Sequence, residues 1–165
     1  MHPHPEARAV SALRKVVSGG QTGVDRAALD VALDLGYEAG GWVPKGRRAE
    51  DGMIPERYRL NETPSRDYEQ RTEWNVRDSD ATLVLATGRL EGGTANTVEL
   101  AHRMDKPVFV VDLLQPRNVA GILYWLDYEK VACLNVAGPR ESKVPGIRAM
   151  AMEYLKDLLV AVKGA

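Results

Sequence analysis

Residues 17–26 (Val-Ser-Gly-Gly-Gln-Thr-Gly-Val-Asp-Arg) have the types and spacing best suited to binding an anion. Gly19, Gly20 and Gly23 allow positive φ angles and let a ligand approach the bare backbone closely. An apolar helical pattern begins at Val24, so the amides of its first turn would point toward the same place, with the positive end of the helix dipole behind them. This first glycine turn (residues 19–23) therefore predicts a phosphate site.

The other candidate ligands of this turn are Gln21, Thr22 and Asp25. A structural alternative stays open, in which Thr22 caps the helix and Asp25 completes a capping box. The glycine spacing matches neither the dinucleotide fingerprint G-x-G-x-x-G nor the P-loop ending G-K-[ST]. The turn thus favours an anion without predicting a standard nicotinamide or triphosphate site.

A second glycine-rich connection follows the apolar segment 81–86, and its candidate ligands are Gly92, Gly93, Thr94 and Asn96. Two such turns at one edge of a sheet are stronger evidence for a ligand than one. The alternative is again a capping box, with Asn96 as the cap and Glu99 three residues later. Glu99 can instead face the ligand, and the sequence leaves both roles open.

A third group of candidates lies in the basic loop (residues 44–52), where Lys45, Arg47 and Arg48 stand close to Trp42. Lysine and arginine bind phosphate through charge-assisted hydrogen bonds, and a tryptophan can stack on a flat heterocycle. The alternative is a solvated loop whose cations offset neighbouring carboxylates. Either role fits the composition of the loop.

The elements that must position these residues alternate between apolar, strand-like runs and helical patterns. Runs such as 82–86 and 108–111 are apolar throughout, as is typical of strands covered on both faces. The pattern predicts an α/β fold, a Rossmann-like parallel sheet with helices on both faces, in which ligands bind at the carboxyl ends of the strands. The expected strands are 15–18, 41–43, 81–86, 107–111 and 130–134, and the expected helices are 24–35, 67–78, 97–104, 119–126 and 145–162.

Length and composition restrict the classes of protein that fit. With 165 residues, 44% of them hydrophobic, we expect a flexible tail over 1–14 and one ligand-binding domain over 15–165. A net charge of −1 predicts no nucleic-acid or membrane partner. The single cysteine, Cys133, is interpreted as a core thiol. With no signal-peptide pattern or membrane-spanning apolar run in this sequence, we expect a cytoplasmic location.

Four segments in order, 19–25, 44–52, 72–80 and 92–94, resemble the family of molybdenum-cofactor carrier proteins, and the resemblance extends over residues 15–112. It implies a Rossmann-like fold and a homo-oligomer, either a dimer or a tetramer. It also implies binding of the molybdenum cofactor, a pyranopterin dithiolene with a terminal phosphate, as cargo. The glycine turns would hold the phosphate, the basic loop would face the rest of the anion, and no side chain is expected to ligate the metal.

The carrier family is similar in fold to the LOG-type phosphoribohydrolases. Their motif Pro-Gly-Gly-x-Gly-Thr-x-x-Glu falls on residues 91–99, which retain both first glycines and Glu99 but have Glu91, Ala95 and Asn96 in place of Pro, Gly and Thr. Arg71 matches the catalytic arginine of those enzymes. The resemblance therefore implies two hypotheses: a binding protein for a phosphorylated pterin or nucleotide-like molecule, or an N-glycosidase that cleaves nucleotide 5′-monophosphates through Arg71 and Glu99.

Overall fold

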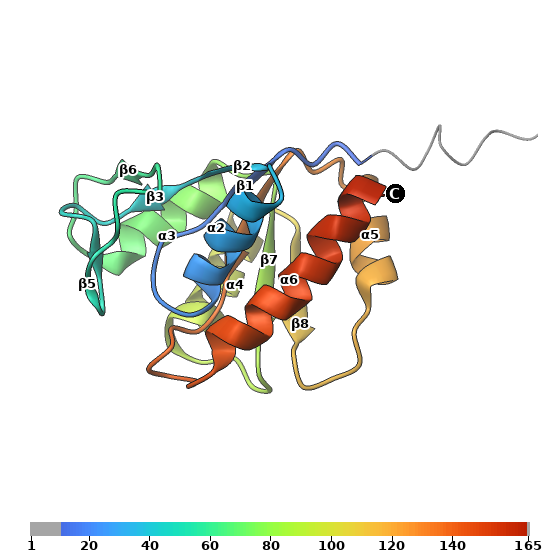
Figure 1. The fold of residues 1–165 in the computed structure, drawn as a ribbon. Helices are drawn as coiled ribbons and strands as arrows, with labels where there is room; N and C mark the ends of the chain where they lie inside the picture. The colour runs from blue at the N-terminus through green and yellow to red at the C-terminus, as the bar shows by residue number, and fades with distance from the viewer. Residues whose placement is uncertain (1–10, 165) are drawn as a thin grey trace, which may run out of the picture.

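The computed structural model describes residues 11–164, so most of the tail expected over 1–14 lies outside the described residues (Figure 1). The main sheet contains β1 (Lys15–Val17), β2 (Glu38–Gly40), β7 (Ala81–Ala86), β8 (Val108–Asp112) and β9 (Cys133–Ala137). These five strands are parallel and follow the order β2-β1-β9-β7-β8. The last strand along the chain is thus inserted at the centre of the sheet.

Helices cover both faces of this sheet. On one face α2 (Val24–Asp34), α5 (Val119–Tyr128) and α6 (Ile147–Gly164) pack together, and α3 (Tyr68–Arg77) packs beside α4 (Gly92–Arg103) on the other (Figure 1). All six residues of β7 are buried, as expected for a strand with helices above and below it. The predicted α/β, Rossmann-like fold is confirmed.

The main core lies between the sheet and α6. The apolar stripe of this helix includes Ile147, Tyr154, Leu155 and Leu158, all of which are buried. A helix of this kind gains most of its stability by covering apolar surface. Its long apolar stripe therefore predicted a helix over residues 145–162, within two residues of the observed bounds of α6.

The short strand expected over residues 41–43 forms, but it lies outside the main sheet. The edge of the main sheet is β2, which ends at Gly40, and β3 (Trp42–Val43) instead pairs with β6 (Asn61–Glu62) outside that sheet. Gly41 separates the two strands, because its φ of 132° turns the chain sharply where its backbone passes close to Ser18. Nearby, β4 (Arg48–Ala49) and β5 (Gly52–Met53) form a short hairpin.

The strand expected over residues 130–134 begins three residues later, at Cys133. Lys130 has a φ of 53°, and the amide of Val131 donates a hydrogen bond to the carbonyl of Leu126. These residues complete the end of α5, so they are not available to the sheet. Cys133 consequently lies at the amino end of β9 and is half-buried instead of forming part of the central core.

The helix expected to begin at residue 97 begins at Gly92, with Glu91 as its N-cap. The amides of Thr94 and Ala95 both donate to the carbonyl of Glu91, 3.2 Å away. Asn96 therefore lies inside the helix, and the capping box of Asn96 with Glu99 is wrong. Glycine has a low helix propensity, and for that reason the sequence pattern placed the start too late.

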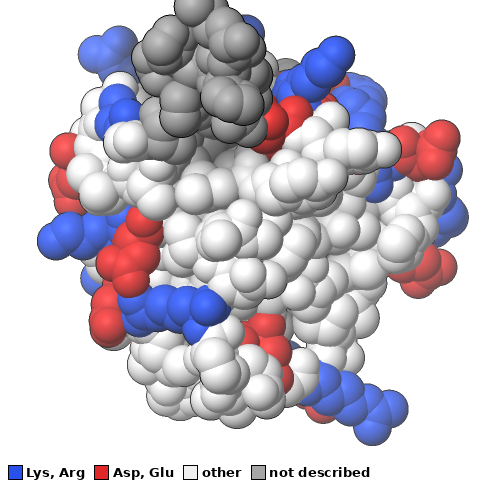
Figure 2. Space-filling model, turned by 90° about the vertical axis from the view of Figure 1, so that its right-hand side faces the viewer, with Lys and Arg blue, Asp and Glu red and all other residues white. Residues whose placement is uncertain are grey.

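None of the helices within residues 11–164 is long and apolar enough to cross a membrane. Figure 2 shows the side of the molecule that carries α5 and β8, where charged side chains gather at the rim and the middle is largely uncharged. Tyr124 and Tyr128 of α5 are exposed here, and their rings stack on each other. We call these two residues the α5 patch.

Candidate functional site

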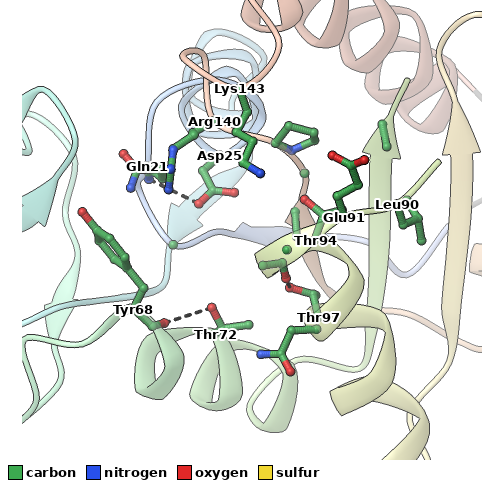
Figure 3. A pocket seen from close by; sticks show the side chains of 18 of the residues that line it. Gln21, Asp25, Tyr68, Thr72, Leu90, Glu91, Thr94, Thr97, Arg140 and Lys143 are labelled. Carbon is green, nitrogen blue, oxygen red and sulfur yellow. Dashed lines mark hydrogen bonds between the residues drawn. The ribbon is translucent and has the colours of Figure 1, made fainter. Parts of the chain in front are cut away.

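A cavity of about 630 Å³ opens at the carboxyl ends of β1, β9 and β7 (Figure 3). Its walls are the connections that follow these three strands, together with the start of α4 and one side of α3. The volume lies within the range of small-molecule sites, and the position is where ligands bind in parallel sheets. Because β9 lies between β1 and β7, three connections meet here instead of the two that the sequence suggested.

The amides of the first glycine turn are largely taken by the protein itself. The Gln21 amide donates to Asp25 Oδ2 (3.2 Å) and the Thr22 amide to the side-chain oxygen of Gln21 (3.1 Å). The amide of Val24 donates to the carbonyl of Pro139 (3.2 Å). An anion at this turn would have to compete with each of these bonds.

The glycines of this turn make room for other parts of the protein. A Cβ atom on Gly19 would lie 2.7 Å from Cδ of Arg71, and one on Gly20 would lie 2.9 Å from an isoleucine and a valine side chain. Gly23, with a φ of 79°, is approached closely by the Pro139 carbonyl. The predicted close approach to bare backbone is present, but it is made by the protein's own atoms.

The capping box of Thr22 with Asp25 is also wrong, because Gly23 is the N-cap of α2 and no side chain caps it. Thr22 Oγ1 accepts a hydrogen bond from the Glu141 amide (3.1 Å) and donates to the Glu50 carboxylate. The side-chain oxygen of Gln21 accepts the Glu50 amide at 2.8 Å. Gln21 and Thr22 thus join the first glycine turn to the basic loop and to the β9–α6 connection.

Asp25 and Arg71 share one wall of the cavity. Arg71 Nη1 donates to the Gly19 carbonyl at 2.9 Å, and the Asp25 side chain turns toward the open space (Figure 3). Burial raises the pKa of Asp25 to about 6, although the charge of Arg71 and the Gln21 hydrogen bond act in the opposite direction. Strongly perturbed carboxyl groups in clefts are typical of functional sites.

The second glycine turn (residues 92–94) and Asn96 all line the cavity. The amides of Gly92 and Gly93 belong to the first turn of α4, where a helix supplies no partner, and no side chain caps this end. A Cβ atom on Gly93 would have nothing within 4 Å, whereas one on Gly92 would lie 3.8 Å from Lys143 Nζ. This end of the cavity therefore combines open amides with a nearby cation.

Three cations of the cavity lining were not predicted as site residues from the sequence: Arg89, Arg140 and Lys143. Arg140 and Lys143 lie in the β9–α6 connection and reach the cavity from above the first glycine turn (Figure 3). Arg140 Nε lies 3.2 Å from a Glu50 oxygen, and Lys143 has no ion-pair partner among residues 11–164. In the sequence, Arg140 and Lys143 stand in a polar loop after the last strand. Only the order of the strands shows that this loop meets the connections that follow β1 and β7.

The basic loop does not line the cavity. The Arg47 guanidinium donates to three backbone carbonyls within its own region, those of Ile54 (3.0 Å), Pro55 (2.7 Å) and Tyr58 (2.8 Å). Arg48 donates to the Arg66 carbonyl at 2.9 Å and covers the ring of Tyr68, a cavity residue, at 4.5 Å from the ring centroid. Lys45 is exposed. Arg48 thus approaches the site only through Tyr68.

Trp42 and Glu99 also lie outside the cavity lining. Trp42 Nε1 donates to Asp78 at 2.8 Å, and its ring packs edge-on against Trp74 with centroids 4.7 Å apart, so it fixes α3. The Glu99 side chain is 68% exposed and lies 3.7 Å from Arg103 on the outer side of α4. Arg71 faces the cavity and Glu99 does not, so the pair that a LOG-type hydrolase needs is not brought together within this chain.

The comparisons with known proteins agree with this fold. The model of the circularly permutated YpsA SLOG family (cpYpsA) matches residues 16–159. A crystal structure from Syntrophus aciditrophicus SB at 1.45 Å resolution, described as a "Putative molybdenum carrier protein", is 45% identical and has a TM-score of 0.88. The match covers 90% of this chain and 96% of that one. No curated protein matches the chain.

These matches confirm the resemblance seen in the four sequence segments and in the arrangement of the sheet. The family match extends over most of the chain and includes all three connections that form the cavity. The chain belongs to the circularly permutated YpsA SLOG family.

Proposed function

We propose that this protein binds the molybdenum cofactor and carries or stores it, with the phosphorylated pyranopterin held in the cavity. The carrier name of the similar crystal structure supports this cargo, and the cavity has a suitable size. The observation that carries the proposal is the uncapped start of α4, which opens into the cavity with Lys143 beside it.

The phosphate of the ligand belongs, in this proposal, at the second glycine turn. The amides of Gly92 and Gly93 are unsatisfied by the helix, and the positive end of its dipole lies behind them. Lys143 adds a full positive charge at the same end, and Arg140 lines the wall next to it. The first glycine turn would then hold Asp25 and Arg71 in position instead of sharing the phosphate.

The residues present also fit a cargo that keeps its own metal ligands. Cys133 lies at the amino end of β9, whereas the cavity lies at the carboxyl ends of the strands. No group of three or more His, Cys, Asp or Glu side chains suited to a metal ion occurs among the described residues. The molybdenum would therefore retain the dithiolene sulfurs of the pterin, and the protein would hold the organic part and the phosphate.

The test is a fluorescence titration with 6-hydroxymethylpterin monophosphate, comparing the parent with Lys143→Ala and Gly93→Val. The space beside Gly93 is open and its φ is not positive, so the Gly93→Val protein should fold normally. The valine side chain would then fill the proposed phosphate position. We expect Lys143→Ala to weaken binding by about 10- to 100-fold, as for one lost hydrogen bond to a charged group, and to reduce its salt dependence.

Lys45→Ala is the matched control, because it removes an exposed lysine outside the cavity and should leave the affinity unchanged. Circular dichroism reports whether each variant is folded. Folded Lys143→Ala and Gly93→Val proteins that both bind as tightly as the parent would exclude the second glycine turn as the phosphate site.

The same samples test the hydrolase hypothesis. Cleavage of a glycosidic bond requires a carboxylate placed at the developing positive charge, and Glu99 lies outside the cavity. We therefore expect no release of adenine when the protein is incubated with AMP. Adenine release that disappears in folded Glu99→Gln or Arg71→Ala protein would establish an N-glycosidase instead of a carrier.

A further inference from the structure

Of the three carboxylates that line the cavity, Asp25, Glu69 and Glu91, only Asp25 is buried, and the binding of a phosphate does not use it. Asp25 is only 6% exposed, and its Oδ2 accepts the amide of Gln21 at 3.2 Å. Its Oδ1 has no hydrogen-bond partner among the described residues, and the carboxylate faces the open space of the cavity (Figure 3). A buried carboxylate is costly unless donors surround it, so the geometry points to a donor that the ligand brings.

The protein groups around Asp25 do not fill this role. Arg71, on the same wall, directs Nη1 to the Gly19 carbonyl, and Arg26 forms a two-point pair with Asp51 at 2.6 and 2.7 Å. Neither guanidinium donates a hydrogen bond to Asp25. The free carboxylate oxygen faces the cavity, whose lining also includes the side chains of Arg140 and Lys143 and the start of α4 (Figure 3).

One ring chemistry matches this arrangement. A 2-amino-4-oxopyrimidine ring, as in a pterin, presents an amino N–H and a ring N–H side by side, and one carboxylate can accept both. Each carboxylate oxygen has two lone pairs, so Oδ2 can accept the ring and the Gln21 amide together. Adenine presents an acceptor next to its amino group and lacks this paired donor edge.

We propose that Asp25 reads the paired N–H edge of the ligand's 2-amino-4-oxopyrimidine ring and thereby selects rings with this edge, such as a pterin, over rings without it, such as adenine or a lumazine. This inference rests on the proposed function, because it assumes that the phosphate of the same ligand lies at the second glycine turn. The first glycine turn and the second then recognise opposite ends of one molecule, a donor edge at Asp25 and an anion at α4.

The test compares two ligands that differ at one position of the ring. 6-Hydroxymethylpterin monophosphate carries the 2-amino group, and 6-hydroxymethyllumazine monophosphate carries an oxygen there, while both keep the phosphate. For the parent we expect the pterin to bind at least about tenfold more tightly, because the lumazine oxygen would face the carboxylate unpaired.

Asp25→Asn should remove or reverse this preference. The Gln21 amide requires an acceptor at the Oδ2 position, so the Asn amino group takes the Oδ1 position and can donate to the lumazine oxygen. Asp34→Asn, an exposed change at the other end of α2, is the matched control and should keep the parent's preference. Circular dichroism confirms that both variants are folded.

The outcomes separate the two proposals. If the parent binds both ligands with equal affinity, or if Asp25→Asn keeps the parent's preference for the pterin, the role of Asp25 is overturned while phosphate binding at α4 stands. If the parent binds neither ligand, the proposed function fails as well.

Discussion

At the scale of one residue, Asp25 shows that a charged group placed in a binding cavity can lower the stability of the fold. Its carboxylate is an acceptor for the Gln21 amide, yet burial disfavours the charge strongly enough to raise the pKa to about 6. Arg71 and Arg26 lower the pKa only in part. A charge kept at a cost to the fold is expected where a ligand uses it.

The stability of the Asp25→Asn variant tests this cost. At pH values between 3.8, the pKa of Asp25 in the unfolded chain, and about 6, its pKa in the folded protein, the folded protein binds more protons than the unfolded chain. The contribution of Asp25 to stability is therefore complete below pH 3.8 and is lost as the pH rises through 6. We expect Asp25→Asn to exceed the parent in free energy of unfolding at pH 7 by up to about 3 kcal/mol.

Urea unfolding of both proteins at pH 4, 5.5 and 7 measures this difference, which should shrink toward zero at the lowest pH. Asp34→Asn, at an exposed position, should follow the parent throughout. A variant that is no more stable than the parent at pH 7 would show that the buried charge carries no cost.

At the scale of elements, the basic loop shows that cations next to a glycine turn do not always face a ligand. Arg47 has a φ of 55° and holds the segment that follows it through the carbonyls of Ile54, Pro55 and Tyr58. The β9–α6 connection, by contrast, supplies Arg140 and Lys143 to the cavity. Which of the two loops faces the site depends on the order of the strands before them.

Arg47→Ala should therefore act on stability instead of on binding. Three carbonyls would lose a charged donor, and we expect the free energy of unfolding to fall by about 2 kcal/mol. Urea unfolding measures this loss, with Lys45→Ala as a control that should change nothing. The salt dependence of pterin monophosphate binding should equal that of the parent, and a flattened dependence would return Arg47 to the ligand site.

At the scale of the whole molecule, the α5 patch bears on the homo-oligomer that the resemblance implies, which stays a prediction. The ten residues of α5 include one charged side chain, Asp127, although the helix lies at the surface. Tyr124 and Tyr128 are 71% and 70% exposed, and their rings stack with centroids 6.2 Å apart. An exposed, largely uncharged surface of this kind is typical of a contact between proteins (Figure 2).

Light scattering tests this expectation. We expect a mass that is a multiple of the 18.2 kDa chain, and Tyr128→Lys should shift the distribution toward the monomer because it places a charge in the uncharged surface. Glu73→Lys, an exposed change on α3 on the opposite face of the sheet, serves as the control. A parent protein that is monomeric at every concentration would contradict the oligomer.

The sequence alone determined the fold class, four of the five strands of the main sheet to within three residues, and both glycine turns. These features depend on local causes: apolar periodicity places α6 and β7, and glycines mark the ends of strands. It also found Asp25, Arg71, Gly92 and Gly93, which all line the cavity. Each of them lies in, or directly after, a pattern that can be read within about ten residues.

Only the tertiary structure decided which of these groups are free to bind. The insertion of β9 between β1 and β7 brings the Pro139 carbonyl to the Val24 amide and Lys143 to the start of α4. The Val24 amide after the first glycine turn is thereby paired within the protein, whereas the amides of Gly92 and Gly93 have no partner from the helix that they begin. Burial and hydrogen-bond satisfaction depend on contacts between segments far apart in the chain, so the spacing of residues along one segment does not determine them.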